Sequence, residues 1–157
     1  MANNSQKIID STRRVVYKFT GDAAETRTLK IDAGALAYAL NANGYIMTGS
    51  DRKSNYGLAL KKVVHSISGG YVEISTDGDT GNTIINLSGA GTMALAEGGD
   101  PITINCASYA NSTGNIFLSM IGGSGAPANT YTVILDFRKL AYSYDQGQTA
   151  DPKAFNV

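Results

Sequence analysis

The stretch YTVILDF, residues 131–137, decides the fold class of this chain of 157 residues. Bulky apolar residues occupy every second position of the stretch, namely Tyr131, Val133, Leu135 and Phe137. In an extended strand such residues all lie on one face, while the residues between them lie on the other. The two-residue period and the bulky side chains predict a β-strand with one buried face.

The same alternation recurs on both sides of this stretch, in seven further segments. They are residues 15–20, 28–32, 57–68, 71–76, 85–88, 102–106 and 116–120. Turn-forming Gly, Asp and Pro residues separate the segments. Within residues 57–68 the alternation breaks near Val63 and Val64, where we expect a β-bulge.

One segment has a helical pattern instead of an alternating one. Asp32 is a suitable N-cap for a short helix that runs to Leu40, with Leu36, Leu40 and Tyr38 as candidates for its buried face. About eight strands and one short helix predict an all-β fold, an antiparallel β-sandwich, and a jelly roll is one topology that fits.

Both ends of the chain lack the alternation. We expect a β-sandwich domain over residues 13–140, an N-terminal arm over residues 1–12 and a C-terminal arm over residues 141–157. The C-terminal arm carries three large aromatic side chains, Tyr142, Tyr144 and Phe155. Either this arm packs on its own domain, or it becomes ordered on a neighbouring protein. On the second interpretation, deleting residues 141–157 leaves a folded domain that no longer binds its partner.

Charge is unevenly distributed along the sequence. Residues 1–62 are net +5, residues 63–137 are net −6 without a single Lys or Arg, and residues 138–157 are net +1. Only 17% of the residues are charged, which is low for a protein domain. This division favours assembly with other copies or with a fixed partner, unless the two parts mix on the folded surface.

Basic residues form two groups that could contact nucleic acid or a carboxylate-rich protein surface. The groups are Arg13-Arg14 with Lys18, and Arg52-Lys53 with Lys61-Lys62. The net charge of zero and the isoelectric point near 6.5 favour a protein partner over nucleic acid. No run approaches the ~18 apolar residues that span a bilayer, and residues 1–10 do not resemble a secretory signal. We therefore expect no nucleic acid and no membrane as partners.

The residue types needed for catalysis or zinc binding are scarce. His65, the only histidine, lies in an apolar stretch, so we expect a strand histidine with a local hydrogen bond. Cys106, the only cysteine, follows Ile102 and Ile104 at the strand period, which predicts a core residue rather than a reactive thiolate. One His and one Cys are too few for a zinc site.

The segment DGDTGN, residues 77–82, holds the first two carboxylates of a calcium-binding loop. Gly81 occupies the third ligand position and Ser88 replaces the bidentate Glu, so we expect a hairpin turn instead. Glycine-rich residues 122–129 lack the Gly-Lys-Ser/Thr of a phosphate-binding loop. The sequence therefore predicts no enzyme, no catalytic residue, no metal and no cofactor.

Three parts of the sequence resemble a group of virion structural proteins of tailed phages, marine and cyanobacterial phages especially. They are IIDSTRRVVYKFTG (residues 8–21), LKIDA (29–33) followed by LAYAL (36–40), and YDQGQTADPKAFN (144–156). The resemblance includes both ends and the order of strands between them, and residues 89–99 match least well. It is not tied to a functional motif, so it implies no residue roles.

This resemblance implies a capsid-associated protein on the virion, and first of all a cement (decoration) protein on the capsid surface, made in the host cytoplasm. We expect a dimer or trimer that bridges major capsid protein subunits through its terminal arms. The anchor residues we predict are Arg13, Arg14, Tyr142, Tyr144 and Phe155. The alternatives are a head–tail connector or tail structural subunit, and a carbohydrate-binding β-sandwich whose exposed tyrosines stack on sugars.

Overall fold

The computed structural model describes residues 3–47, 51–78, 82–95, 102–104, 112–122 and 129–146. Within these residues the chain forms ten strands and one turn of 3-10 helix, η1, over Ala33–Ala35. The strands are β1 (Asn4–Asp10), β2 (Arg14–Gly21), β3 (Glu25–Ile31), β4 (Leu58–Ser68), β5 (Gly70–Thr76), β6 (Asn82–Leu87), β7 (Ala90–Ala94), β8 (Ile102–Ile104), β9 (Ile116–Gly122) and β10 (Thr130–Lys139).

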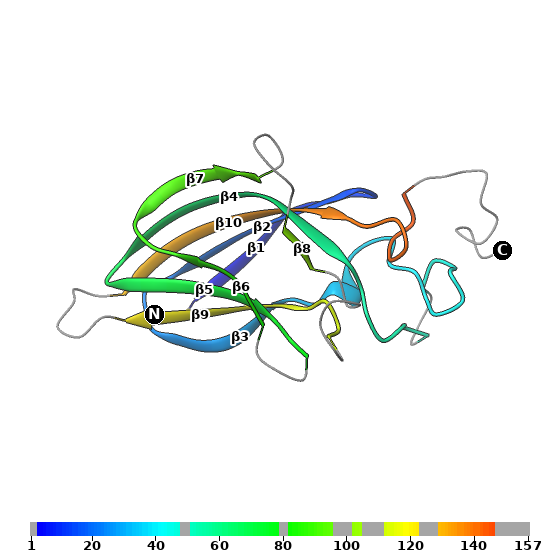
Figure 1. The fold of residues 1–157 in the computed structure, drawn as a ribbon, viewed down its shortest axis with the longest axis horizontal. Helices are drawn as coiled ribbons and strands as arrows, with labels where there is room; N and C mark the ends of the chain where they lie inside the picture. The colour runs from blue at the N-terminus through cyan, green and yellow to red at the C-terminus, as the bar shows by residue number, and fades with distance from the viewer. Residues whose placement is uncertain are drawn as a thin grey trace.

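The strands form two antiparallel sheets, which lie as two layers in Figure 1. Sheet A has six strands in the order β1-β2-β10-β4-β7, and β8 pairs with the end of β4 that β7 does not reach. Sheet B has four strands in the order β3-β9-β5-β6. The all-β sandwich predicted from the alternation is confirmed, while the jelly-roll topology stays a prediction.

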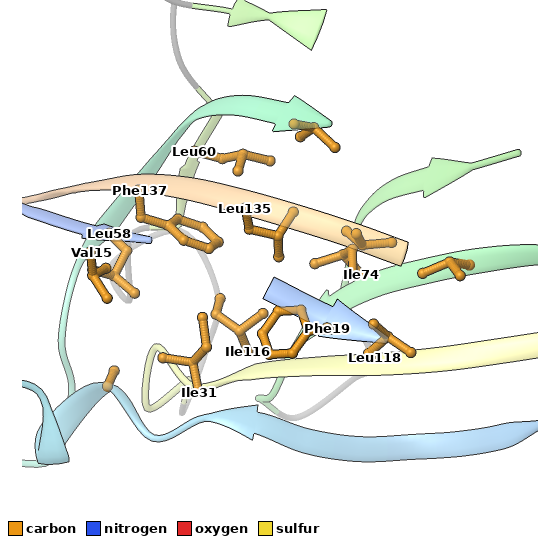
Figure 2. Packing of buried hydrophobic residues seen from close by; sticks show 14 of the residues in the cluster. Val15, Phe19, Ile31, Leu58, Leu60, Ile74, Ile116, Leu118, Leu135 and Phe137 are labelled. Carbon is orange, nitrogen blue, oxygen red and sulfur yellow. The ribbon is translucent and has the colours of Figure 1, made fainter. Parts of the chain in front are cut away.

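The core lies between the two sheets (Figure 2). Strand β10 lies at the centre of sheet A, paired with β2 on one side and with β4 on the other. The apolar residues that predicted this strand are all buried and face the core, namely Tyr131, Val133, Leu135 and Phe137. Across the sandwich, Ile74 of β5 and Leu118 of β9 supply part of the opposite wall.

Strand β4 changes its buried phase part-way along. Leu60 is buried before the change and Val63 is buried after it. The pairing with β10 skips Lys61, which is therefore the extra residue of a β-bulge. The bulge allows apolar side chains on both sides of it to point into the core. It lies slightly earlier than predicted, since the sequence placed it near Val63 and Val64.

The connection between β3 and β4 covers one end of the sandwich. Asp32 caps η1, because its Oδ1 accepts a hydrogen bond from the Gly34 N–H at 3.2 Å. Leu36 and Leu40 are buried, as predicted for this segment. Tyr38 is 43% exposed, so it does not belong to the buried face.

The helix predicted to run to Leu40 is wrong beyond Ala35. Two backbone amides that would continue it are bound by other segments. The Ala37 N–H donates to the Asp10 carboxylate at 3.0 Å, and the Leu40 N–H donates to the Ser143 carbonyl oxygen at 2.9 Å. Tertiary hydrogen bonds thus replace the helical ones.

The predicted N-terminal arm is wrong for residues 4–10, which form β1 at the edge of sheet A. Five of the seven side chains of β1 are exposed, and so are all five of β7, the second strand beyond the eight predicted. An edge strand with both faces exposed needs no apolar alternation. For this reason the two-residue period could not reveal either strand.

Candidate partner-binding surfaces

The five predicted anchor residues lie in unlike surroundings. Arg13 is exposed in the turn between β1 and β2, and Arg14 is exposed at the start of β2. Tyr142 is 51% exposed, whereas Tyr144 is fully buried. Phe155 lies outside the described residues. Of the five, only Arg13, Arg14 and Tyr142 are therefore shown to be accessible to a partner.

Tyr144 corrects the prediction of a free arm over residues 141–157. Its ring lies 5.6 Å from the Tyr56 ring, and its hydroxyl donates to the Ala33 carbonyl oxygen at 2.7 Å. The Ser143 hydroxyl beside it accepts a hydrogen bond from the Gly57 N–H. The β3–β4 connection supplies the pocket, so the first residues after β10 belong to the folded domain.

Lys139 joins three segments beneath this end of the sandwich. Its ammonium is fully buried and donates to the Asp10 carboxylate, to the Ser11 carbonyl oxygen at 2.6 Å and to the Ala37 carbonyl oxygen at 2.8 Å. Burial lowers the pKa of Lys139 more than the Asp10 carboxylate raises it. The Lys139 charge is therefore used inside the fold and does not reach a partner.

Basic residues at the same end are also bound within the chain. Lys53 Nζ donates to the Tyr142 carbonyl oxygen at 3.0 Å and lies 5.2 Å from the centroids of the Tyr56 and Tyr142 rings. Arg52 forms two hydrogen bonds to the Asp32 carboxylate, at 2.6 and 3.2 Å. The Arg52–Lys53 group thus helps to hold the β3–β4 connection in place.

The outer face of sheet A carries the largest group of outward-pointing cations in the described residues. We call this surface the basic face. Its charged residues are Arg14, Lys18, Lys62, Arg138 and Asp136. The strand register places Lys18 and Val64 on either side of Ile134, and Lys62 directly opposite Asp136. These side chains share one face because directly paired residues of neighbouring strands point the same way.

One carboxylate offsets part of this charge. Arg14 donates to both oxygens of Asp136, from Nε at 3.1 Å and from Nη2 at 2.9 Å. Among the described residues, Lys18, Lys62 and Arg138 have no carboxylate within ion-pair distance. Four cations and one carboxylate leave the basic face with three net positive charges.

The outer face of sheet B differs in composition, and we call it the apolar face. It is formed by the partly exposed apolar side chains Leu29, Tyr71, Phe117 and Ile121, with Arg27 and Glu73 among them. The two sheets therefore present opposite faces of different chemistry to the surroundings.

The acidic middle of the sequence forms no acidic face within the described residues. Asp77 accepts hydrogen bonds from Ser112 and Thr113, and Asp136 is bound by Arg14. The other four carboxylates are Glu73 on the apolar face, and Asp79, Glu97 and Asp100, which lie outside the described residues. The basic face thus has no acidic counterpart in the part of the chain that the structure describes.

His65 and Asp77, which were candidates for a catalytic or metal-binding role, make structural contacts. His65 lies on β4, as predicted, but its Nδ1 is 3.2 Å from the Gly89 carbonyl oxygen, which is 24 residues away in the sequence, so its contact is not local. Asp77, from the failed calcium loop, binds the residues that precede β9. Cys106 lies outside the described residues. In the described parts of the chain, no three His, Cys, Asp or Glu side chains are placed to share a metal ion.

A shallow hollow of about 360 Å³ lies where β2 ends and β10 begins. Thr20 and Ser66 stand on either side of Thr132 across three neighbouring strands, so their hydroxyls form a row. The full lining is Thr20, Gly21, Asp22, Ser66, Thr130, Tyr131 and Thr132. Hydroxyl and carboxylate groups of this kind suit a neutral polar ligand.

The chain matches no protein-family model, no curated protein and no solved structure. None of the helical structure in the described residues is long and apolar enough to cross a membrane.

Sequence reasoning did not single out Lys18, Lys62 and Arg138 as one surface. A signal was present, since Lys18 falls on the polar phase of a predicted strand, and Arg14 and Arg138 continue the polar phase one residue beyond the ends of two predicted strands. The order of the strands in the sheet was needed to bring them together.

Proposed function

We propose that this chain is a cement protein of a phage virion, which binds the outside of the capsid across joints between major capsid protein subunits. We assign the capsid contact to the basic face of sheet A. The observation that carries this assignment is the set of three net positive charges on one face of a sheet. The resemblance of both ends of the sequence to phage virion structural proteins supports the class of partner.

The basic face has the physical properties of a surface for an acidic protein partner. Its cations project from neighbouring strands of one hydrogen-bonded sheet, so little backbone entropy is lost when a partner binds. Val64 and Ile134, both partly exposed, lie between the charges and supply apolar area. Complementary charge speeds encounter and selects the partner, while apolar contact adds affinity. The corresponding patch on the capsid should therefore be acidic.

The test compares binding of two variants to purified heads that lack this protein. Lys18→Gln with Lys62→Gln removes two charges from the basic face, and we expect at least ~10-fold weaker binding, a loss of ~1.4 kcal/mol. The matched control is Ala24→Asp with Ser88→Asp, which changes the net charge by the same amount at two exposed turn positions. Equal binding by the two double variants would contradict the assignment.

A second experiment distinguishes a cement protein from the alternative structural role. A head–tail connector or tail structural subunit would bind only at the vertex or on the tail. Electron microscopy of gold-labelled protein on heads and tails distinguishes the two. Binding over the whole head surface supports a cement protein.

The hydroxyl-lined hollow favours a second candidate function, binding of a neutral carbohydrate at the virion surface. Thr20, Thr132 and Ser66 can donate and accept hydrogen bonds with sugar hydroxyls. The exposed Tyr38, Tyr71 and Tyr142 do not line the hollow, so the stacking expected from the sequence does not apply there. A glycan array probed with wild type and Thr132→Val tests it, and binding that Thr132→Val leaves unchanged would exclude the hollow.

A further inference from the structure

Tyr38, in the turn that follows η1, adopts a backbone conformation that is unusual for a tyrosine. Its φ is +66°, in the left-handed region where glycine and asparagine predominate. A Cβ in this region lies close to the following carbonyl oxygen, so a bulky residue here strains the backbone. The turn alone would therefore favour Gly or Asn at this position, because both tolerate a positive φ.

Neighbouring segments hold this strained turn in place. The Ala37 N–H donates to the Asp10 carboxylate at 3.0 Å, and the Ala37 carbonyl oxygen accepts a hydrogen bond from Lys139 Nζ at 2.8 Å. The Tyr38 carbonyl oxygen accepts a hydrogen bond from the Asp145 N–H, also at 2.8 Å. Strained conformations persist only where the surroundings fix them, and they are frequent at functional sites.

Packing inside the fold does not explain the tyrosine either. Tyr38 is 43% exposed, whereas Leu36 and Leu40 of the same connection are buried. The Lys139 ammonium lies 5.8 Å from the Tyr38 ring centroid, but it lies closer to the Tyr144 ring, at 5.2 Å, and already donates to three oxygen acceptors. Since neither the turn nor the core requires a tyrosine at this position, the ring points to a role at the surface.

The Tyr38 ring lies near the β1–β2 turn, at one end of the basic face. The Lys139 ammonium that approaches the ring also donates to the Ser11 carbonyl oxygen in this turn, at 2.6 Å. Arg13 is exposed in the same turn, and the next residue, Arg14, begins β2 and belongs to the basic face. An exposed aromatic ring thus lies close to the cations at this end of the molecule.

We propose that Tyr38 is an aromatic anchor for the capsid, and that the contact extends from the basic face over the β1–β2 turn to this ring. This inference rests on the proposed function. The occupant is an apolar side chain of the major capsid protein, beside the acidic patch that faces the basic face. Tyr and Arg are enriched among the residues that dominate binding energy at interfaces.

The strained turn would favour such a contact. Tyrosine offers a large apolar ring with only two side-chain torsions to fix, so little side-chain entropy is lost on binding. The hydrogen bonds of Ala37 and Tyr38 fix the backbone before the partner arrives, so the ordering cost is lower than for a mobile loop.

Tyr38→Asn tests the proposal, because Asn tolerates a positive φ and lacks the ring. Binding to purified heads that lack this protein should weaken at least ~10-fold, while the midpoint urea concentration of unfolding should stay equal or rise. The matched control is Tyr71→Asn, since Tyr71 is 41% exposed on strand β5 of the other sheet. The control should bind heads like wild type and unfold at lower urea, because Asn is a poor strand residue.

The two measurements separate the possible outcomes. A lower urea midpoint for Tyr38→Asn than for wild type would mean that the ring serves the fold, and would overturn the proposal. Full head binding by Tyr38→Asn, or equal losses of head binding in both variants, would overturn it as well. If Lys18→Gln with Lys62→Gln weakens head binding and Tyr38→Asn does not, only this inference fails. A wild type that does not bind heads overturns the proposed function, and the assignment of Tyr38 with it.

Discussion

Among the described glycines, Gly114 is the one whose replacement the surrounding backbone resists most. Its φ is +87°, and a Cβ at this position would lie 1.9 Å from the Tyr56 carbonyl oxygen. Because the obstacle is backbone, no side chain can move aside. We expect Gly114→Ala to lower the free energy of unfolding by at least ~3 kcal/mol.

Gly89 provides the matched control for this prediction. Its φ is +62°, but nothing lies within 4 Å of a Cβ built there. Gly89→Ala should therefore cost only the backbone strain of ~1–2 kcal/mol. Urea unfolding of both variants measures the difference, and equal losses would mean that the close approach to Tyr56 does not matter.

Lys139 should contribute more to stability than any exposed lysine. Lys139→Met leaves the Asp10 carboxylate without its buried partner, and we expect a loss of ~3–5 kcal/mol in the free energy of unfolding. Lys7 binds the same carboxylate at 3.3 Å from an exposed position, so Lys7→Met should cost ~1 kcal/mol or less. Similar losses from the two variants, measured by chemical denaturation, would contradict this view of Lys139.

Asp10 should make the protein sensitive to acid. Burial alone would raise the pKa of Asp10, but hydrogen bonds from Lys139 and from the Ala37 N–H outweigh it, so the pKa lies below its usual value. A lowered pKa means that its contribution is complete above the unfolded value of ~3.9 and is lost as the pH falls through the folded value. Thermal melts between pH 7 and pH 2 should show a shallower acid decline for Asp10→Asn than for wild type. An unchanged decline would exclude this carboxylate as a cause.

At the scale of elements, the residues that follow β10 belong to the folded domain, because Tyr144 is buried and Ser143 binds Gly57. Deleting residues 141–157 removes Tyr144 from the core and should cost at least ~3–5 kcal/mol, the usual loss for a large buried aromatic. Deleting only residues 147–157 keeps the contacts of Ser143 and Tyr144, so the β-domain should remain folded. The shorter deletion therefore tests whether residues 147–157 contribute to capsid binding. Circular dichroism melts of the two truncations, followed by head-binding assays, check both statements.

How far the sequence predicts each element follows from where the element lies in its sheet. Strand β10 was predicted because it lies at the centre of sheet A and packs one face into the core along its length, which produces strict alternation. Strands β1 and β7 have mostly exposed side chains and leave no such pattern. The helix to Leu40 failed because local capping by Asp32 was outweighed by hydrogen bonds to Asp10 and Ser143, which are distant in sequence.

The candidate surfaces are harder to predict from the sequence than the strands, because they depend on the order of the strands in each sheet. The polar phase of a predicted strand indicates that Lys18 or Arg138 points outward. It does not indicate that β2, β10 and β4 are neighbours, because strands far apart in the sequence are paired. The basic face and the apolar face are therefore properties of the sheet order, and no local pattern contains them.

At the scale of the whole molecule, the proposed capsid binding should depend on salt. The basic face carries three net positive charges that are partly exposed, and interactions of such charges are screened over ~10 Å at 0.1 M salt and ~3 Å at 1 M. Raising the salt from 0.1 to 1 M should therefore weaken head binding at least ~10-fold. Cosedimentation with heads in the two buffers measures the effect. Head binding of equal strength at both salt concentrations would mean that the charges of the basic face do not hold the protein on the capsid.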